Sequence, residues 1–225
     1  MADKSFFKED ILLLAKWVLE CPMIREHYAL GGGAWLTLRL PKMARISRDV
    51  DVFSSKEEIS SYKAMMEIVA LCKKGKIPYR ITRRGQHFCQ LFVSYPKKSE
   101  IKIDIGKIWH PIKLIVDPDL HCPILSPTDM ILEKLQCIVD RIEPTDLYDL
   151  CRLHEAYPNE FEKSLKRLSK TEEVSELLIR IQRCLEATDG VGTKESLNLK
   201  EKKWMESYIS KIIHKITFLI KKLGL

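Results

Sequence analysis

The sequence contains no apolar run that approaches the roughly 18 residues needed to cross a bilayer. Its amino terminus interleaves acidic residues and lysines before a short apolar run, which a secretion signal does not do. Internal repeats and low-complexity tracts are also missing. These absences argue against a membrane-embedded, secreted or repeat-built protein. We expect a soluble cytoplasmic protein with no membrane partner.

Zinc-binding and disulfide patterns are missing as well. The seven cysteines are scattered, odd in number and never spaced as Cys-x-x-Cys. The six histidines form no ligand pair at helical spacing, and the His121-Cys122 pair has no companion ligands. The sequence therefore predicts reduced cysteines and no zinc site. At 225 residues, the chain is long enough to bury a core without such cross-links.

The formal net charge is +7, and the surplus of basic residues is greatest at the carboxyl end. Residues 194–225 contain eight lysines and three glutamates. A basic segment of this kind favours a polyanion such as RNA. It is equally compatible with a lysine-rich, solvated helix face, so charge alone does not choose between the two interpretations.

Hydrophobic periodicity divides the chain into a mixed half and a helical half, with the break near residue 120. The first half predicts, in order, a helix over 6–21, a strand at "HYAL", a helix at "AWLTLRL", a strand at "DVDVF" and a helix at "KEEISSYKAMMEIVALCKKGK". The runs "YRIT", "HFCQLFVSY" and "EIKIDIGKI" predict three further strands, and prolines at 111, 118 and 123 indicate a connection. The second half predicts helices at about 127–141, 145–156, 159–168, 171–186 and 200–222.

Two closely spaced carboxylates are the first candidate site. Asp49 and Asp51 are two apart in a predicted strand, so their side chains share one face. Carboxylates this close repel each other unless a cation lies between them, and oxygen ligands suit Mg²⁺ or Mn²⁺. In "IKIDI", the alternation places Asp104 opposite the buried isoleucine face. We expect Asp104 to join the pair as a third metal-binding acid.

Glycines and basic residues near these acids suit an anion. Gly32 and Gly33 lack β-carbons, so their backbone N–H groups can approach phosphate oxygens at the start of the following helix. Arg45 and Arg48 can hold a triphosphate or an acceptor backbone. Ser47, which lies between them, is counted with the candidate nucleotide-binding residues. Each signal is weak alone, but their combination in this order is uncommon by chance.

Four sequence blocks carry a family resemblance: "YALGGGAWLTLRL", "RISRDVDVF", "IKIDI" and "SPTDMILEKLQCIVDRIEPTDLYDL". Over about residues 27–150, the chain resembles the nucleotidyltransferase toxins of the AbiEii type, a branch of the polymerase-β-like superfamily. The resemblance implies an α+β fold, in which a nucleotidyltransferase-like mixed β-sheet flanked by helices is followed by a C-terminal helical bundle. We place the domains at 1–122 and 123–225. The resemblance also implies that Asp49 and Asp51 bind metal.

The fourth block adds residues that composition does not identify. The family pattern there is a helical Glu-Lys-Leu, then an arginine, then an Asp-Leu-Tyr-Asp-Leu run, which here are residues 133–135, Arg141 and residues 146–150. By resemblance, Lys134 contacts the nucleotide phosphates, Arg141 assists in nucleotide binding and Asp146 is a further essential acid. Without the resemblance, the same residues would be interpreted as a surface ion pair between packed helices.

The leading hypothesis is an Mg²⁺-dependent (or Mn²⁺-dependent) enzyme that transfers a nucleoside monophosphate from an NTP to an acceptor hydroxyl. The resemblance implies a toxin of a toxin–antitoxin or phage-defence system, with a cognate antitoxin and with RNA, such as a tRNA 3′ end, as acceptor. One alternative is transfer to a hydroxyl group of a small molecule or a protein. Binding of a cationic small molecule such as an aminoglycoside would need an acidic pocket, whereas this chain is basic. The other is a non-catalytic module that binds nucleotide or a partner, which Ala34 favours because the family commonly has a hydroxyl residue there.

Overall fold

The computed structural model describes residues 4–43, 45, 47, 49–95, 100–108, 110–118, 121–170, 174–187 and 197–223. The chain divides into two compact units, Met1–Ser126 and Pro127–Leu225. Within the described ranges, no helix combines the length and the apolar character that a membrane span requires.

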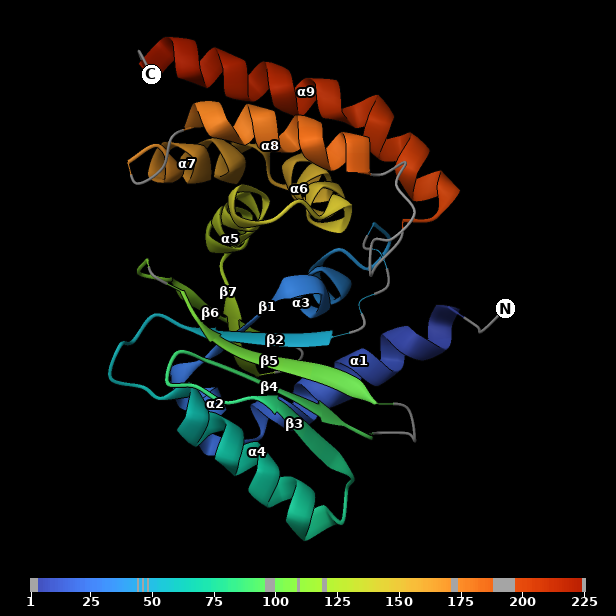
Figure 1. The fold of residues 1–225 in the computed structure, drawn as a ribbon, viewed down its shortest axis with the longest axis vertical. Helices are drawn as coiled ribbons and strands as arrows, with labels where there is room; N and C mark the ends of the chain where they lie inside the picture. The colour runs from blue at the N-terminus through green and yellow to red at the C-terminus, as the bar shows by residue number, and fades with distance from the viewer. Residues whose placement is uncertain are drawn as a thin grey trace. The chain divides into compact units, whose positions relative to one another are not determined.

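The first unit is built around a mixed sheet, to which the described residues contribute seven strands (Figure 1). In chain order these are β1 (Ala29–Gly31), β2 (Asp49–Ser54), β3 (Tyr79–Arg83), β4 (Phe88–Val93), β5 (Ile101–Lys107), β6 (Leu114–Asp117) and β7 (Cys122–Leu125). Their order across the sheet is β3-β4-β5-β2-β1-β7-β6. The pairs β2–β5 and β1–β7 are parallel, and the other neighbours are antiparallel. Strands β2 and β5, which carry the candidate acids, are therefore neighbours inside the sheet.

The alternation of apolar and polar residues fixes which way these two central strands face. Val50 and Val52 of β2 are fully buried, as are Ile103 and Ile105 of β5. The residues between them are only partly buried. Because side chains alternate between the two faces of a strand, the polar residues of β2 and β5 share the opposite face of the sheet. The alternation predicted from the sequence is observed in both strands.

The helices of the first unit are α1 (Lys4–Leu19), α2 (Pro22–His27), α3 (Gly32–Arg39) and α4 (Ser61–Gly75). Helix α4 packs on β4 and β5, whereas α3 packs on β1 and β2, and Figure 1 shows the two helices on opposite sides of the sheet. The indole N–H of Trp35 donates to the carbonyl of Leu125 at 2.8 Å. This buried bond ties α3 to β7 and so fixes the helix that begins at the glycine turn.

The second unit is helical in its described residues. It consists of α5 (Pro127–Asp140), α6 (Pro144–Ala156), α7 (Pro158–Leu168), α8 (Val174–Ala187) and α9 (Leu199–Leu223). Helix α5 packs against α6, α7 and α8, and α9 packs against α6 and α8. Ile212, Ile216 and Leu219 on one stripe of α9 are almost fully buried. That burial agrees with the apolar spacing of the sequence in this segment.

Two features differ from the sequence-based expectation. The proline-containing stretch interpreted as a connection contains β6 and β7, in which Pro123 lies opposite Val116. A proline is tolerated in a strand wherever its missing N–H is not required by the ladder. Pro22 was expected only to end the first helix, but it also begins α2. At the first position of a helix no N–H donor is needed, so a proline fits there. The α+β fold class itself, a mixed sheet flanked by helices and followed by helices, is confirmed.

Candidate active site

Three carboxylates converge on the polar face of β2 and β5. In the parallel pairing of these strands, Asp51 lies opposite Asp104, while Asp49 lies two residues before Asp51 on the same face. One carboxylate oxygen from each of the three acids lies within 4.8 Å of the others. All three side chains are partly buried, so the surrounding medium screens their mutual repulsion less than bulk water would. The cluster therefore needs a compensating positive charge.

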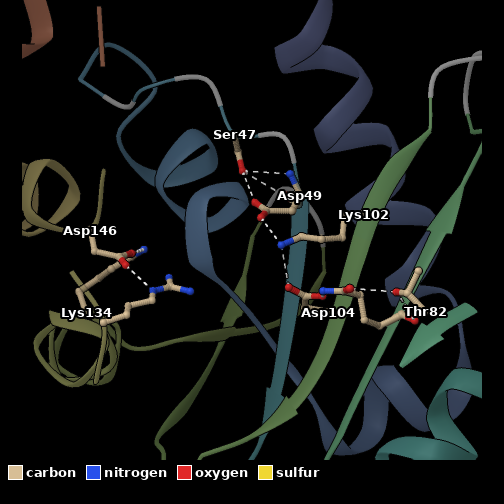
Figure 2. Close-up of polar contacts among 9 residues, drawn as sticks. Ser47, Asp49, Thr82, Lys102, Asp104, Lys134 and Asp146 are labelled. Atoms are coloured by element: carbon tan, nitrogen blue, oxygen red, sulfur yellow. Dashed lines mark hydrogen bonds and ion pairs between the residues drawn. The ribbon is translucent and has the colours of Figure 1, made fainter. Parts of the chain in front are cut away.

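A lysine that the sequence analysis assigned no role supplies part of that charge. Lys102 lies opposite Asp49 in the strand pairing and two residues before Asp104 on β5. Its Nζ lies 3.0 Å from Oδ2 of Asp49 and 2.9 Å from Oδ2 of Asp104. Figure 2 shows the ammonium group between the two carboxylates. Lys102 thus bridges the two strands at the acid cluster.

The bridge is reflected in the pKa values of both partners. Burial by itself raises the pKa of Asp49, but attraction to Lys102, assisted by Arg45 and by a hydrogen bond from Ser47, lowers it below its ordinary value overall. Burial likewise lowers the pKa of Lys102, but the charges of Asp49 and Asp104 outweigh this and raise it. Both groups are therefore charged at neutral pH.

The third acid is held from the other side by a chain of hydrogen bonds. Gln90 of β4 lies opposite Asp104, and its amide nitrogen donates to Oδ1 of Asp104 at 2.9 Å. The hydroxyl of Thr82 on β3 donates to the amide oxygen of Gln90 at 2.9 Å. This chain leads from Thr82 to the acid cluster in Figure 2. It fixes the orientation of the Asp104 carboxylate before any ligand arrives.

The segment before β2 contributes a serine to the cluster. Ser47 is almost fully buried, and its hydroxyl donates to Oδ1 of Asp49 at 3.0 Å. Arg45 is partly buried and close enough for its charge to favour ionised Asp49. Arg48, predicted to bind nucleotide, lies outside the described residues. Among the described residues of this segment, Ser47 and Arg45 are therefore the ones that act on Asp49.

The glycine turn is required by the acid cluster itself. Gly32 has φ of 57°, in the left-handed region, and a β-carbon there would lie 1.8 Å from Oδ2 of Asp51. A β-carbon on Gly33 would lie 2.4 Å from the hydroxyl oxygen of Ser47. The first residues of α3 therefore lie directly against two candidate site residues. The absence of these two side chains allows the amino end of a helix, which attracts anions, to approach the acids.

These residues fit a divalent cation. The donors are carboxylate oxygens, which Mg²⁺ and Mn²⁺ prefer over nitrogen or sulfur ligands. The ammonium of Lys102 already contacts two of the three acids, so the cluster accommodates a positive charge at this position. Asp49, Asp51 and Asp104 can therefore hold a metal ion.

The second unit contains a buried charge cluster at the fourth sequence block. Nζ of Lys134 lies 2.7 Å from Oδ1 of Asp146 and 3.1 Å from Oδ2 of Asp149. Arg141, just beyond the end of α5, contacts Oδ2 of Asp146 with its Nε at 2.7 Å. Figure 2 shows the Lys134 and Asp146 pair. The two aspartates and the lysine are almost completely buried, whereas Arg141 is 60% exposed.

The interpretation of this pair as a surface ion pair is therefore wrong. The side chains of α5 and α6 enclose Lys134 and Asp146, because both helices turn apolar faces toward each other. Burial raises the pKa of Asp146, but the charges of Lys134 and Arg141 lower it to about 2 overall. The neighbouring Glu133 has its pKa raised by burial. Inside a protein, such a pair is weakened far less by solvent than at the surface.

Sequence reasoning missed three residues that complete these clusters. Lys102 lies two residues before Asp104, so the strand alternation already placed both side chains on one face. Only the register of β5 against β2 shows that Lys102 lies opposite Asp49. Asp149 lies inside the quoted Asp-Leu-Tyr-Asp-Leu run, three residues after Asp146 and hence on the same helix face. Gln90 had no sequence signal, because only the pairing of β4 with β5 brings it to Asp104.

The aromatic residues of α9 belong largely to the interior of the second unit. Tyr208 is buried, and its hydroxyl lies 2.9 Å from Nδ1 of His154. Trp204 stacks on Tyr208 with ring centroids 5.1 Å apart, and the guanidinium of Arg152 covers its ring. These contacts favour a packing role over base stacking for this cluster.

Comparison with solved structures agrees with the fold. No curated protein matches the sequence as a relative. JHP933 from Helicobacter pylori has 18% identity, with 95% of this chain and 98% of that chain aligned at a TM-score of 0.51. A second structure from Helicobacter pylori, also 18% identical, aligns over 94% of this chain and 97% of its own at a TM-score of 0.53. MenT4, a nucleotidyltransferase toxin from Mycobacterium tuberculosis, has 15% identity over 97% of this chain and 99% of its own, with a TM-score of 0.46.

The two Helicobacter structures show that the whole fold is shared, although their low identity says nothing further about this chain. A family model described as "Nucleotidyl transferase AbiEii toxin, Type IV TA system" matches residues 13–208. That range contains both charge clusters and the glycine turn. The chain therefore belongs to the AbiEii family of nucleotidyltransferase toxins.

Proposed function

We propose that this protein transfers a nucleoside monophosphate from an NTP to a hydroxyl group of RNA, with Mg²⁺ or Mn²⁺ bound by Asp49, Asp51 and Asp104. The observation that carries the proposal is the convergence of these acids on two adjacent strands beside the glycine turn. The bound metal would neutralise the negative charge that develops on the phosphates during transfer. The proposal assigns the sheet unit to nucleotide binding and transfer.

The nucleotide-binding roles follow from charge and position. The N–H groups of Gly32 and Gly33 begin α3, so they can donate to phosphate oxygens. Ser47 donates a hydrogen bond to Asp49, and the charge of Arg45 acts on the same carboxylate. Both residues can therefore position the triphosphate, a role that we extend to Arg48 by sequence. A helix start and arginines together bind an anion more tightly than either does alone.

Within the helical unit, we propose that Lys134 and Arg141 bind phosphate oxygens and that Asp146 positions both of them. Asp146 contacts the two basic side chains at once, one through each carboxylate oxygen. This arrangement can hold Lys134 and Arg141 in fixed orientations. Arg141 is the more exposed of the two and is therefore the more accessible to a ligand.

The proposed reaction forms one bond and breaks one. The acceptor hydroxyl oxygen bonds to the α-phosphorus of the NTP, the bond from that phosphorus to the bridging oxygen of the β-phosphate breaks, and pyrophosphate leaves. The proton of the hydroxyl passes to the carboxylate of Asp104, whose Oδ1 accepts a hydrogen bond from Gln90 and whose Oδ2 must first be released by the ammonium of Lys102.

The nature of the acceptor is supported by charge. Lysines at positions 200, 203, 211, 221 and 222 of α9 are exposed, whereas the apolar stripe of the helix is buried. Such a basic face favours the phosphate backbone of RNA, and the tRNA 3′ end, which presents a free hydroxyl, is the acceptor that we propose. Since family members are toxins of type IV toxin–antitoxin systems, we also propose that a cognate antitoxin counteracts the activity.

The direct test incubates the protein with each labelled NTP, Mg²⁺ and one of three acceptors: total RNA, a protein extract or an aminoglycoside. We expect label on RNA, an equal amount of released pyrophosphate, and loss of both when the metal is chelated. Asp51→Asn is the inactive comparison, and Glu100→Gln, which removes an exposed carboxylate just before β5, is the control.

Two results would replace the proposal. Label that appears only on the aminoglycoside or on protein would assign a different acceptor. Absence of pyrophosphate release, together with calorimetric NTP binding that is unchanged in Asp51→Asn, would indicate a non-catalytic binding module.

A further inference from the structure

Lys102 competes for the oxygens that a metal ion would need. Its ammonium group contacts Oδ2 of Asp49 and Oδ2 of Asp104 at 3.0 and 2.9 Å. Magnesium binds carboxylate oxygens at about 2.1 Å, so a metal shared by the same acids must lie either in the space of the ammonium or directly beside it. A divalent ion and an ammonium that share ligands in a partly buried site repel each other strongly. Both cannot keep these contacts together.

The position of Lys102 leaves it able to move. Its Cα is fixed by the pairing of β5 with β2, but the side chain is 30% exposed and carries the ammonium on a flexible four-carbon stem. Leaving the acids would deprive the ammonium of its two partners, and a partly buried charge without a partner is costly. The anion that arrives with the metal in the proposed reaction is the triphosphate. Its phosphate oxygens would replace the two carboxylates as partners of the ammonium.

We infer that Lys102 is a place-holding cation, which bridges Asp49 and Asp104 before metal binds, gives them up to the metal, and then binds a phosphate oxygen of the NTP. The inference rests on the proposed function and adds a nucleotide-binding residue to it. In the metal-free protein the lysine keeps the acids from repelling each other. With metal and NTP bound, it adds positive charge at the phosphates.

The test compares the Mn²⁺ affinity of the wild type with that of Lys102→Met in the absence of nucleotide, measured by calorimetry and by the electron paramagnetic resonance signal of free Mn²⁺. Because the competing cation is gone, we expect Lys102→Met to bind Mn²⁺ at least about tenfold more tightly. Thermal unfolding should show a lower Tm without metal and a larger rise with Mn²⁺ than in the wild type. At saturating Mn²⁺, the KM for NTP should rise about tenfold, because a phosphate contact is lost.

Two further variants keep the test decisive. Lys107→Met makes the same change on the same strand, but its side chain projects from the other face and contacts the backbone carbonyl of Glu57, so its Mn²⁺ affinity should match the wild type. Lys102→Gln removes the charge while keeping a hydrogen-bond donor, so it is the variant to use if Lys102→Met does not fold without metal. It should also bind Mn²⁺ more tightly than the wild type does.

The outcomes separate this inference from the proposed function. If the wild type transfers nucleotide but both Lys102 variants bind Mn²⁺ equally to it or more weakly, the place-holding role is wrong and the proposed function stands. If the Lys102 variants bind Mn²⁺ more tightly but the wild type transfers nothing to any acceptor, the metal competition stands, while the phosphate contact and the proposed function both fail.

Discussion

Asp51 and Asp104 lie directly opposite each other on the parallel strands β2 and β5. The same register places Lys102 opposite Asp49, so a single alignment of two strands produces both the acid cluster and its bridging cation. A shift of one residue would turn the side chains of one strand to the other face. The site therefore depends on the strand pairing as much as on the identity of the acids.

The first prediction concerns Asp51→Asn. Because the amide is neutral, it holds a cation less tightly, and we expect nucleotide transfer to fall at least about a hundredfold. The fold should persist, since the amide has nearly the same size and relieves repulsion from Asp104. Rates of pyrophosphate release and thermal unfolding measure the two effects. A variant that loses its fold would show that Asp51 is a structural residue.

The second prediction concerns the glycine turn. Gly32→Ala would place a β-carbon 1.8 Å from Oδ2 of Asp51, at a backbone φ of 57°. We expect it to destabilise the protein by about 2 kcal/mol and to abolish transfer, because the Asp51 carboxylate must move. Urea unfolding and the labelling assay measure both effects.

The matched control for this glycine is Gly106→Ala on β5. A β-carbon there would meet the rings of Phe53 and Phe88 at ordinary contact distances of 3.5 and 3.6 Å. We expect a change in stability within about 0.5 kcal/mol. Equal losses from the two substitutions would mean that the contact with Asp51 does not determine the requirement for glycine at 32.

The third prediction concerns Lys134→Ala. Removing the ammonium of Lys134 leaves Asp146 and Asp149 buried with fewer positive partners. We therefore expect a loss of about 3 kcal/mol in the free energy of unfolding. The protein that remains folded should use NTP less well, by about 2 kcal/mol in kcat/KM, as expected for a lost charged phosphate contact. Activity equal to the wild type would remove Lys134 from the site.

A surface lysine provides the comparison for that variant. Lys166 forms an exposed pair with Glu162 on α7, and Lys166→Ala should change stability by less than about 1 kcal/mol. A similar cost for the two lysines would indicate that burial does not strengthen the Lys134 pair.

The fourth prediction concerns acid. The folded-state pKa of Asp146, lowered to about 2 from an ordinary 3.8, means that its contribution is fully present above about pH 4 and is lost as pH falls toward 2. Between about pH 6 and pH 2, the wild type should therefore lose about 2 kcal/mol more stability than Asp146→Asn, in which this carboxyl is absent. Denaturant unfolding at a series of pH values measures the difference. Equal losses in the two proteins would show that the Asp146 pKa is not depressed.

The sequence by itself determined much of the local structure. The two-residue alternation in β2 and β5 placed Asp49 and Asp51 on one face and separated Asp104 from the buried isoleucines. Helical spacing identified α5 and α9, and the order of the sequence blocks indicated the family that the match over residues 13–208 shows. These features are readable because each follows from neighbouring residues along the chain.

Only the tertiary structure decided which residues meet. The pairing of β2 with β5 brings Lys102 to Asp49, which lies 53 residues earlier in the sequence, and the pairing of β4 with β5 brings Gln90 to Asp104. Packing of α5 against α6 turns an apparent surface pair of Lys134 and Asp146 into a buried one. Such contacts are not encoded by local spacing, because strand register and helix packing depend on how distant apolar faces are buried together.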